Sequence, residues 1–175
     1  VVGDLAGFTA ATYMRGVPVV QVPTSLLAMI DAAIGGKTGV DTPTGKNLVG
    51  AFHQPALVLA DHVTLASLPA AHVRNGLAEA LKHAAITGTA EFDWLLTAAP
   101  AMLRAGGPDM ATAAELVERH VGIKVSIVAR DEREGGLRKV LNAGHTIGHA
   151  IERAVDYAML HGECVGIGLR VEAAI

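Results

Sequence analysis

The sequence predicts an α/β segment followed by an all-helical segment. Short β-branched runs at 17–22 and 56–60 are typical of buried strands. After Pro69 the apolar residues follow a helical spacing, interrupted by glycine, proline or charged breaks. The chain has 175 residues, of which 51% are hydrophobic and 18% charged, so it can form a folded core. This change from short strands to helical spacing divides the chain into residues 1–65 and residues 66–175.

Each segment has its own expected elements. The first is expected to hold a helix at 4–14, a strand at 17–22, a helix at 23–33, a glycine-rich loop at 34–47 and a strand at 56–60. The second is expected to hold helices at 71–87, 89–104, 110–130, 140–156 and 163–175.

Composition excludes several classes of protein. The net charge is −3 and no basic run is present, which argues against a nucleic-acid-binding protein. No apolar run is long enough to span a membrane. Cys164 is the single cysteine, which indicates a reduced, cytoplasmic setting. The chain starts without methionine and stops inside an expected helix, so we expect it to be part of a longer polypeptide.

Two Gly-Lys units in the expected loop could bind an anion. They are Gly36-Lys37 and Gly45-Lys46, and glycine lets backbone N–H groups approach a phosphate closely. A nucleotide-binding P-loop requires glycine five residues before each pair, where this chain has Asp31 and Val40. A phosphate site of another kind fits better, and a flexible turn with solvated lysines is the alternative.

Histidines form the second candidate site. His145 and His149 are spaced i, i+4 and so share one helix face, as metal ligands often do. The zinc peptidase pattern needs glutamate after the first histidine, where this chain has Thr146. His161 follows sixteen residues after His145, and a carboxylate could come from Glu79, which shares a face with Lys82. Spacing alone does not choose these residues, because Glu79 and Lys82 taken alone are better explained as an ordinary surface ion pair.

Taken together, these segments resemble the 3-dehydroquinate synthase family of sugar-phosphate cyclases. Several motifs occur in the family's order across nearly the whole chain. They are Gly3-Asp4-Leu5-Ala6-Gly7-Phe8, Gln21-Val22-Pro23-Thr24-Ser25, Gly35-Gly36-Lys37-Thr38-Gly39, Gly45-Lys46-Asn47-Leu48-Val49-Gly50, Gly76-Leu77-Ala78-Glu79, Asn142-Ala143-Gly144-His145-Thr146-Ile147-Gly148-His149 and His161-Gly162-Glu163.

The resemblance implies the end of a Rossmann-like NAD-binding domain followed by a helical metal-binding domain. It implies Zn²⁺, with Co²⁺ possible at the same site, and NAD as cofactors. By motif position, Glu79, His145 and His161 would bind the metal. The residues with implied catalytic roles around the substrate hydroxyls are Asp31, Lys82, Glu134 and His149.

The resemblance also implies the contacts to substrate, cofactor and partner. Lys37 and Asn47 would hold the substrate phosphate, and Arg15 would reach a phosphate across a homodimer interface. The set implied for the substrate carboxylate and ring is Lys124, Arg138 and Asn142, and the set implied for NAD is Asp4, Thr24, Ser25 and Lys46.

The family converts 3-deoxy-D-arabino-heptulosonate 7-phosphate to 3-dehydroquinate and phosphate, a lyase step of the shikimate pathway that leads to aromatic amino acids. Transient oxidation by NAD, elimination of phosphate, reduction and an intramolecular aldol reaction make up the sequence. Sister cyclases such as the aminodehydroquinate, deoxy-scyllo-inosose and epi-valiolone synthases are alternatives, as is a polyol dehydrogenase. The set Lys124, Arg138 and Asn142 favours an acid-bearing substrate over the latter two cyclases, but it does not separate the aminated variant. A non-catalytic module is the alternative from another class.

Overall fold

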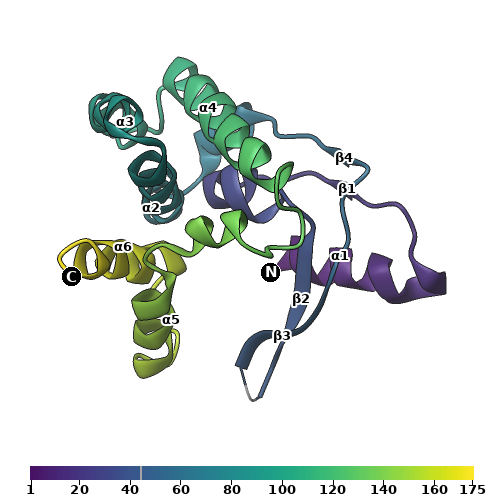
Figure 1. Ribbon diagram of the computed structural model, residues 1–175. Helices are drawn as coiled ribbons and strands as arrows, with labels where there is room; N and C mark the ends of the chain where they lie inside the picture. The colour runs from purple at the N-terminus through teal and green to yellow at the C-terminus, as the bar shows by residue number, and fades with distance from the viewer. Residues whose placement is uncertain (44) are drawn as a thin grey trace.

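The computed structural model describes residues 1–43 and 45–175, and it places a small α/β portion beside a larger group of helices (Figure 1). This agrees with the predicted fold class. In chain order, the elements are α1 (Val2–Thr12), the 3-10 turn η1 (Tyr13–Arg15), β1 (Val20–Gln21), the π-helical turn η2 (Ala28–Ala32), β2 (Lys37–Thr42), β3 (Gly45–Phe52), β4 (Leu57–Val58), the 3-10 turn η3 (His62–Ser67), α2 (Ala70–Thr87), α3 (Thr89–Met102), α4 (Met110–Val128), the 3-10 turn η4 (Leu137–Asn142), α5 (His145–Ala154) and α6 (His161–Glu172).

The strands β1 and β4 form a parallel pair. Val20 pairs with Leu57 and Gln21 with Val58, so both strands are shorter than the runs that predict them. The carboxyl end of β1 leads into residues 23–25, and ligands of α/β sheets bind outside the carboxyl ends of strands. The division of the chain at residue 65 stays a prediction.

The prediction of a loop at 34–47 is wrong, because most of these residues belong to a β-hairpin. Strands β2 and β3 pair antiparallel, and Gly39 lies opposite Gly50. A Cβ atom at Gly50 would overlap the backbone of Thr38, so the glycines at this crossing let the two strands approach closely. Glycine here marks close backbone contact, which composition alone does not distinguish from a flexible loop.

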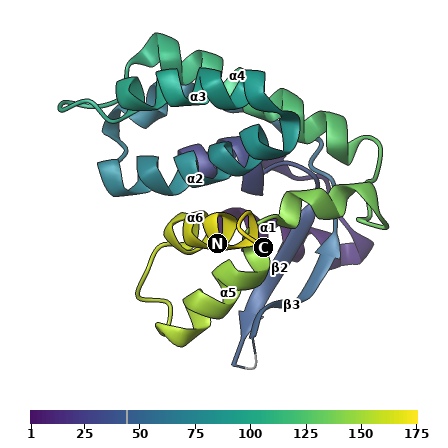
Figure 2. The ribbon, with the colours of Figure 1, turned by 60° about the vertical axis from the view of Figure 1, so that its left-hand side comes forward.

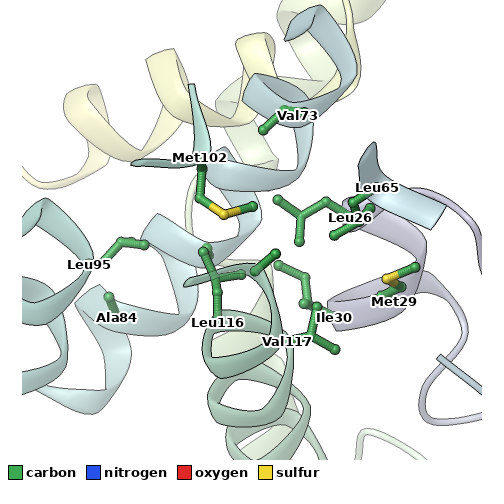
Figure 3. Close-up of a cluster of buried hydrophobic side chains, with 12 residues drawn as sticks. Leu26, Met29, Ile30, Leu65, Val73, Ala84, Leu95, Met102, Leu116 and Val117 are labelled. Atoms are coloured by element: carbon green, nitrogen blue, oxygen red, sulfur yellow. The ribbon is translucent and has the colours of Figure 1, made fainter. Parts of the chain in front are cut away.

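The helices form two packed groups. In Figure 2, α3 and α4 lie above α2, while α5 and α6 lie below it and the β2–β3 hairpin extends beside them. Helix α2 packs against both α3 and α6. The core between α2, α3, α4 and the segment around η2 is built from apolar side chains (Figure 3). Leu26, Met29 and Ile30 are completely buried in it.

One glycine of α2 allows the η2 segment to reach that core. A Cβ atom at Gly76 would lie 2.6 Å from the Cβ of Leu26, so only glycine permits this approach. The packing brings Asp31, at the end of η2, close to Lys82 on α2. The core therefore positions charged groups at its edge.

The helix expected at 140–156 is interrupted. A 3-10 turn ends at Asn142, and Gly144 has a φ of 77°, a conformation that favours glycine. Helix α5 then begins at His145, and α6 begins at His161 instead of residue 163. Both histidines are thus the first residues of helices. No helix among the described residues is long and apolar enough to cross a membrane.

Candidate metal centre and anion-binding cavity

Three helices bring Glu79, His145 and His161 together. Glu79 comes from the middle of α2 and is completely buried. Its Oε1 atom lies 3.2 Å from Nε2 of His161 and 3.7 Å from Nε2 of His145. One ligand atom from each residue lies within 4.8 Å of the other two. This spacing allows one ion to contact all three.

Each imidazole is oriented through its other ring nitrogen. Nδ1 of His145 lies 3.1 Å from the carbonyl oxygen of Ala143, and Nδ1 of His161 lies 3.2 Å from Oε1 of Glu152. With Nδ1 donating to these oxygens, Nε2 of each ring carries the lone pair and faces Glu79. The rings are therefore held in the orientation that a metal bound through Nε2 needs.

The donor set fits a divalent metal. Within the described part of the chain, Oε1 of Glu79 is buried and makes no hydrogen bond of good geometry, although Nε2 of His161 lies 3.2 Å away. A buried carboxylate oxygen without a partner costs free energy unless a cation balances it. Two histidines and one carboxylate with a fourth position open make a common catalytic zinc arrangement.

Charges around the centre set the protonation states of its members. Burial and Asp31 oppose ionisation of Glu79, but His161 and Lys82 outweigh them and lower the pKa of Glu79. Burial lowers the pKa of His145 and so favours its neutral form. Burial also opposes protonation of His161, but the carboxylate of Glu79 outweighs it and raises the pKa of His161.

His149 lies beside this centre and is not part of its Glu79 group. Its side chain is 60% exposed, and its Nε2 atom lies 3.8 Å from Oε2 of Glu152. The rings of His145 and His149 are perpendicular, with centroids 5.3 Å apart. His149, Glu152 and His161 make up a second cluster with metal-ligand spacing.

A cavity of about 620 Å³ opens beside the centre. The predicted site residues that line it are Asp4, Asp31, Lys37, Lys46, Asn47, Lys82, Lys124, Arg138, Asn142, His145, His149 and His161. Glu79 is not among the lining residues, and its side chain is completely buried. The structure thus brings most of the predicted metal, substrate and cofactor residues to one cavity.

Asp31 connects two buried lysines on one wall of the cavity. Its Oδ1 atom lies 2.7 Å from Nζ of Lys124 and 3.5 Å from Nζ of Lys82, and Lys82 also pairs with Glu79. Burial raises the pKa of Asp31, but the two lysines outweigh burial and hold the pKa well below its usual range. Burial lowers the pKa of Lys124, and Asp31 offsets this only in part. Lys82 is 1% exposed and Glu79 is 0% exposed. Their burial excludes the surface ion pair that spacing left open.

A second wall holds Arg138 and the partners of the β2–β3 hairpin. Arg138 is 1% exposed and donates from Nη2 to the carbonyl oxygen of Gly35 at 2.8 Å. Glu134 pairs with Lys37 and accepts a hydrogen bond from Nδ2 of Asn142 at 2.7 Å. Glu134 thus contacts two residues of the cavity wall from a neighbouring depression.

Three predicted site residues have positive φ angles without being glycine. The angles are 70° for Arg15, 54° for Asn47 and 59° for Glu134. Asn47 lies where the register shifts, so that Asp41 of β2 faces residues 46–48 of β3. Bulges of this kind redirect side chains, and such backbone conformations often occur at functional sites.

Some predicted residues lie outside the cavity. Arg15 is exposed in η1, and Thr24 and Ser25 follow the carboxyl end of β1. None of these three lines the 620 Å³ cavity, which is defined by described residues of this one chain. Their predicted roles stay predictions.

Family comparison identifies the chain. The profile described as the 3-dehydroquinate synthase N-terminal region matches residues 1–75, and the profile described as its C-terminal region matches residues 76–175. The chain belongs to the 3-dehydroquinate synthase family. The resemblance seen in the motifs is therefore confirmed.

Curated members of the 3-dehydroquinate synthase family match along the whole chain. The 3-dehydroquinate synthase of Symbiobacterium thermophilum is 54% identical over 175 residues, which are 100% of this chain and 48% of the relative. The 3-dehydroquinate synthase of Nitrosomonas europaea is 51% identical over 174 residues, covering 99% of this chain and 46% of the relative. The chain thus spans about half the length of these relatives.

Solved structures of sister enzymes share the fold. The 2-epi-5-epi-valiolone synthase of Streptomyces hygroscopicus subsp. jinggangensis, with NAD⁺ and Zn²⁺ bound, superposes with a TM-score of 0.82 at 36% identity, over 95% of this chain and 46% of that one. A 2-deoxy-scyllo-inosose synthase with carbaglucose-6-phosphate, NAD⁺ and Co²⁺ gives a TM-score of 0.83 at 29% identity, over 95% and 45% of the two chains.

Two residues that lie at this site were assigned no role in the sequence analysis. Oδ1 of Asn75 accepts a hydrogen bond from the backbone N–H of Gly162 at 2.6 Å and so fixes the start of α6. Glu152 contacts His161. A signal for Glu152 was present, because it lies seven residues after His145 and three after His149 on the same helix face.

A pair of buried histidines lies outside the candidate metal centre. His83 and His120 are completely buried, with ring centroids 5.6 Å apart. Nε2 of His83 lies 3.7 Å from Asp31, and Nε2 of His120 lies 4.0 Å from Glu91. Burial, followed by His83 and Arg119, lowers the pKa of His120 to about 3.

We expect this pair to make the protein sensitive to acid. The unfolded pKa of histidine is about 6.5, so between about pH 3 and 6.5 the unfolded state binds more protons at His120 than the folded state. The stability is therefore fully present above about pH 6.5 and falls with decreasing pH, by up to about 1.4 kcal/mol per pH unit for each proton taken up. Urea unfolding at several pH values measures this slope.

His120→Leu should flatten the slope, because the titrating group is gone. His72→Leu, which changes an exposed histidine of α2, is the matched control and should leave the slope as it is. Equal slopes in His120→Leu and the unchanged protein would contradict the prediction.

Proposed function

We propose that the protein containing this chain is a 3-dehydroquinate synthase that converts 3-deoxy-D-arabino-heptulosonate 7-phosphate to 3-dehydroquinate and phosphate, using Zn²⁺ and NAD⁺. The observation that carries the proposal is that one cavity joins the histidine–glutamate cluster to a cationic wall. The substrate has a phosphate at one end and a carboxylate at the other, and both ends need cations. The cavity offers them from Lys37, Lys124 and Arg138.

Glu79, His145 and His161 would hold the metal, for which Co²⁺ is a plausible substitute because a sister enzyme carries it. When bound, the metal supplies Lewis acidity to a substrate oxygen, and NAD⁺ supplies a transient hydride acceptor. Asp31 and Lys82 lie beside the metal centre, within reach of hydroxyls bound there. We assign them, with Glu134 and His149, to positioning hydroxyls and transferring their protons.

The two anionic ends of the substrate would be held by two different sets of residues of the cavity. Lys37 and Asn47, on the hairpin, would bind the phosphate, which would compete with Glu134 for Lys37. Lys124, Arg138 and Asn142 would bind the carboxylate and ring. Arg138 retains N–H donors beyond those used for Gly35 and Glu132, since a guanidinium has five. Fixing both ends would restrict the substrate to a reactive geometry.

The NAD site would include Asp4, Thr24, Ser25 and Lys46. Thr24 and Ser25 lie after the carboxyl end of β1, which is where nucleotides bind to parallel α/β sheets. Asp4 and Lys46 reach the cavity.

Arg15 would act in a homodimer. It is exposed and lies outside the cavity of its own chain, as expected for a residue that reaches the partner's site.

A cytoplasmic location belongs to the same proposal, because Cys164 is a free, buried thiol.

The identities of the relatives favour dehydroquinate synthase over a sister cyclase. The two curated dehydroquinate synthases are 54% and 51% identical to this chain, whereas the valiolone and inosose synthases are 36% and 29% identical. The carboxylate-binding set Lys124, Arg138 and Asn142 supports the same choice.

A phosphate-release assay on the full-length protein tests the proposal. Heptulosonate 7-phosphate with NAD⁺ and Zn²⁺ should release phosphate and form 3-dehydroquinate, while His145→Ala should release none above background. The aminated analogue of the substrate is the comparison arm. Faster release from that analogue, or no release from either compound above the His145→Ala control, would overturn the assignment.

A further inference from the structure

The carboxylate of Glu152 connects the metal centre to the β2–β3 hairpin. Glu152 lies on α5, and its side chain is 3% exposed. Its Oε1 atom lies 3.2 Å from Nδ1 of His161 and 2.9 Å from Nζ of Lys46, which is on β3. A buried carboxylate thus holds a histidine by the ring nitrogen that does not face Glu79.

A second metal ion between His149, Glu152 and His161 is the competing explanation of this cluster. Lys46 argues against it, because its ammonium group already balances Glu152 at 2.9 Å and would repel a divalent ion. His149 is 60% exposed, and its Nε2 atom is 3.8 Å from Glu152, so this histidine is the least constrained of the three. The contacts therefore favour a structural use of the carboxylate.

The orientation of the His161 ring depends on this contact. His161 is the first residue of α6, where the backbone fixes the Cα position and leaves the ring free to rotate. The bond from Nδ1 to Glu152 places the proton on Nδ1 and directs the lone pair of Nε2 toward Glu79, 3.2 Å away. His145 obtains the same orientation from a backbone carbonyl, so the two imidazoles use different partners for one purpose.

We propose that Glu152 is a positioning residue of the metal centre, which fixes the ring orientation and tautomer of His161 and thereby raises the affinity for the metal. Lys46 supplies the countercharge that allows the carboxylate to stay buried. The inference rests on the metal centre proposed above.

Zinc affinity, measured by competition with a chromophoric chelator, tests this role. Glu152→Ala should weaken zinc binding by about 10- to 100-fold, the usual effect of losing an outer-shell partner of a histidine ligand. Glu152→Gln keeps an oxygen that accepts from Nδ1, so it should restore part of the affinity. The matched control is Arg153→Ala, which changes the exposed neighbouring residue of α5 and should leave zinc affinity near that of the unchanged protein.

A spectroscopic readout on the unchanged protein does not depend on any variant folding. With ¹⁵N-labelled histidine and bound zinc, Nδ1 of His161 should carry a proton protected from exchange with water. In a separate measurement on the variants, the visible spectrum of the Co²⁺ form should change in Glu152→Ala and stay close to normal in Arg153→Ala.

The outcomes separate the two proposals. Failure of the unchanged protein to bind zinc overturns the metal centre itself. Zinc binding with full affinity in Glu152→Ala, or an unprotonated Nδ1 of His161, overturns only the role of Glu152. Equal losses in Glu152→Ala, Glu152→Gln and Arg153→Ala would assign the effect to a general disturbance of α5 and would also overturn it.

Discussion

Glu79→Gln is expected to abolish zinc binding at the proposed centre and, in the full-length protein, phosphate release. The substitution keeps the shape of the side chain but removes the charge that faces the two imidazoles at 3.2 and 3.7 Å. A neutral amide is a poor zinc ligand, and the remaining two histidines leave the ion with too few protein donors. Because Glu79 would contact the ion directly, the loss of affinity should exceed the 10- to 100-fold expected for outer-shell changes.

Zinc competition and the phosphate-release assay measure this effect. Glu163→Gln is the matched control. Glu163 lies two residues after His161, is exposed, and accepts a hydrogen bond from the backbone of Leu160 that glutamine can also accept. It should therefore bind zinc normally. Zinc binding by Glu79→Gln at near-normal affinity, or a comparable loss in Glu163→Gln, would contradict the assignment of Glu79 as a ligand.

The sequence allowed the prediction of this centre only through motif resemblance. The i, i+3 spacing of Glu79 and Lys82 is the same on a buried helix face and on an exposed one. Their burial depends on α6 and on the segment around η2, which pack against α2 from distant parts of the chain. Helical periodicity was sufficient for α2, α3 and α4, because their apolar faces meet within one core.

The hairpin and the interrupted helix show where local pattern is insufficient. Residues 37–42 and 45–52 contain several glycines, so their composition resembles a loop, but pairing between the two strands decides their conformation. The break before His145 depends on the positive φ of Gly144, and a glycine inside an apolar periodic run does not reveal that angle. In both places, contacts distant in sequence override the local preference.

Gly168→Ala is expected to destabilise the fold and to weaken metal binding together. A Cβ atom at Gly168 would overlap the carbonyl oxygen of Gly144 and lie 2.9 Å from the backbone nitrogen of Gly148, so α5 and α6 would have to move apart. Overpacking of this kind typically costs about 1–3 kcal/mol, which exceeds the gain of up to about 1 kcal/mol from replacing a helical glycine. His145 directly follows Gly144, so the same movement would displace it from His161.

Gly166→Ala on the same helix is the matched control, because a Cβ atom there meets no neighbour within 4 Å. It should raise the free energy of unfolding by up to about 1 kcal/mol and leave zinc affinity unchanged. Urea unfolding of the metal-free protein and zinc competition measure the two effects separately. If Gly168→Ala were as stable as Gly166→Ala, the close contact of α5 and α6 would not hold in solution. If it were less stable but bound zinc normally, the spacing of the two helices would not set the distance between His145 and His161. The combination expected here, lower stability with weaker zinc binding, would show that the close approach of two helix backbones is what brings two metal ligands from different helices into one site.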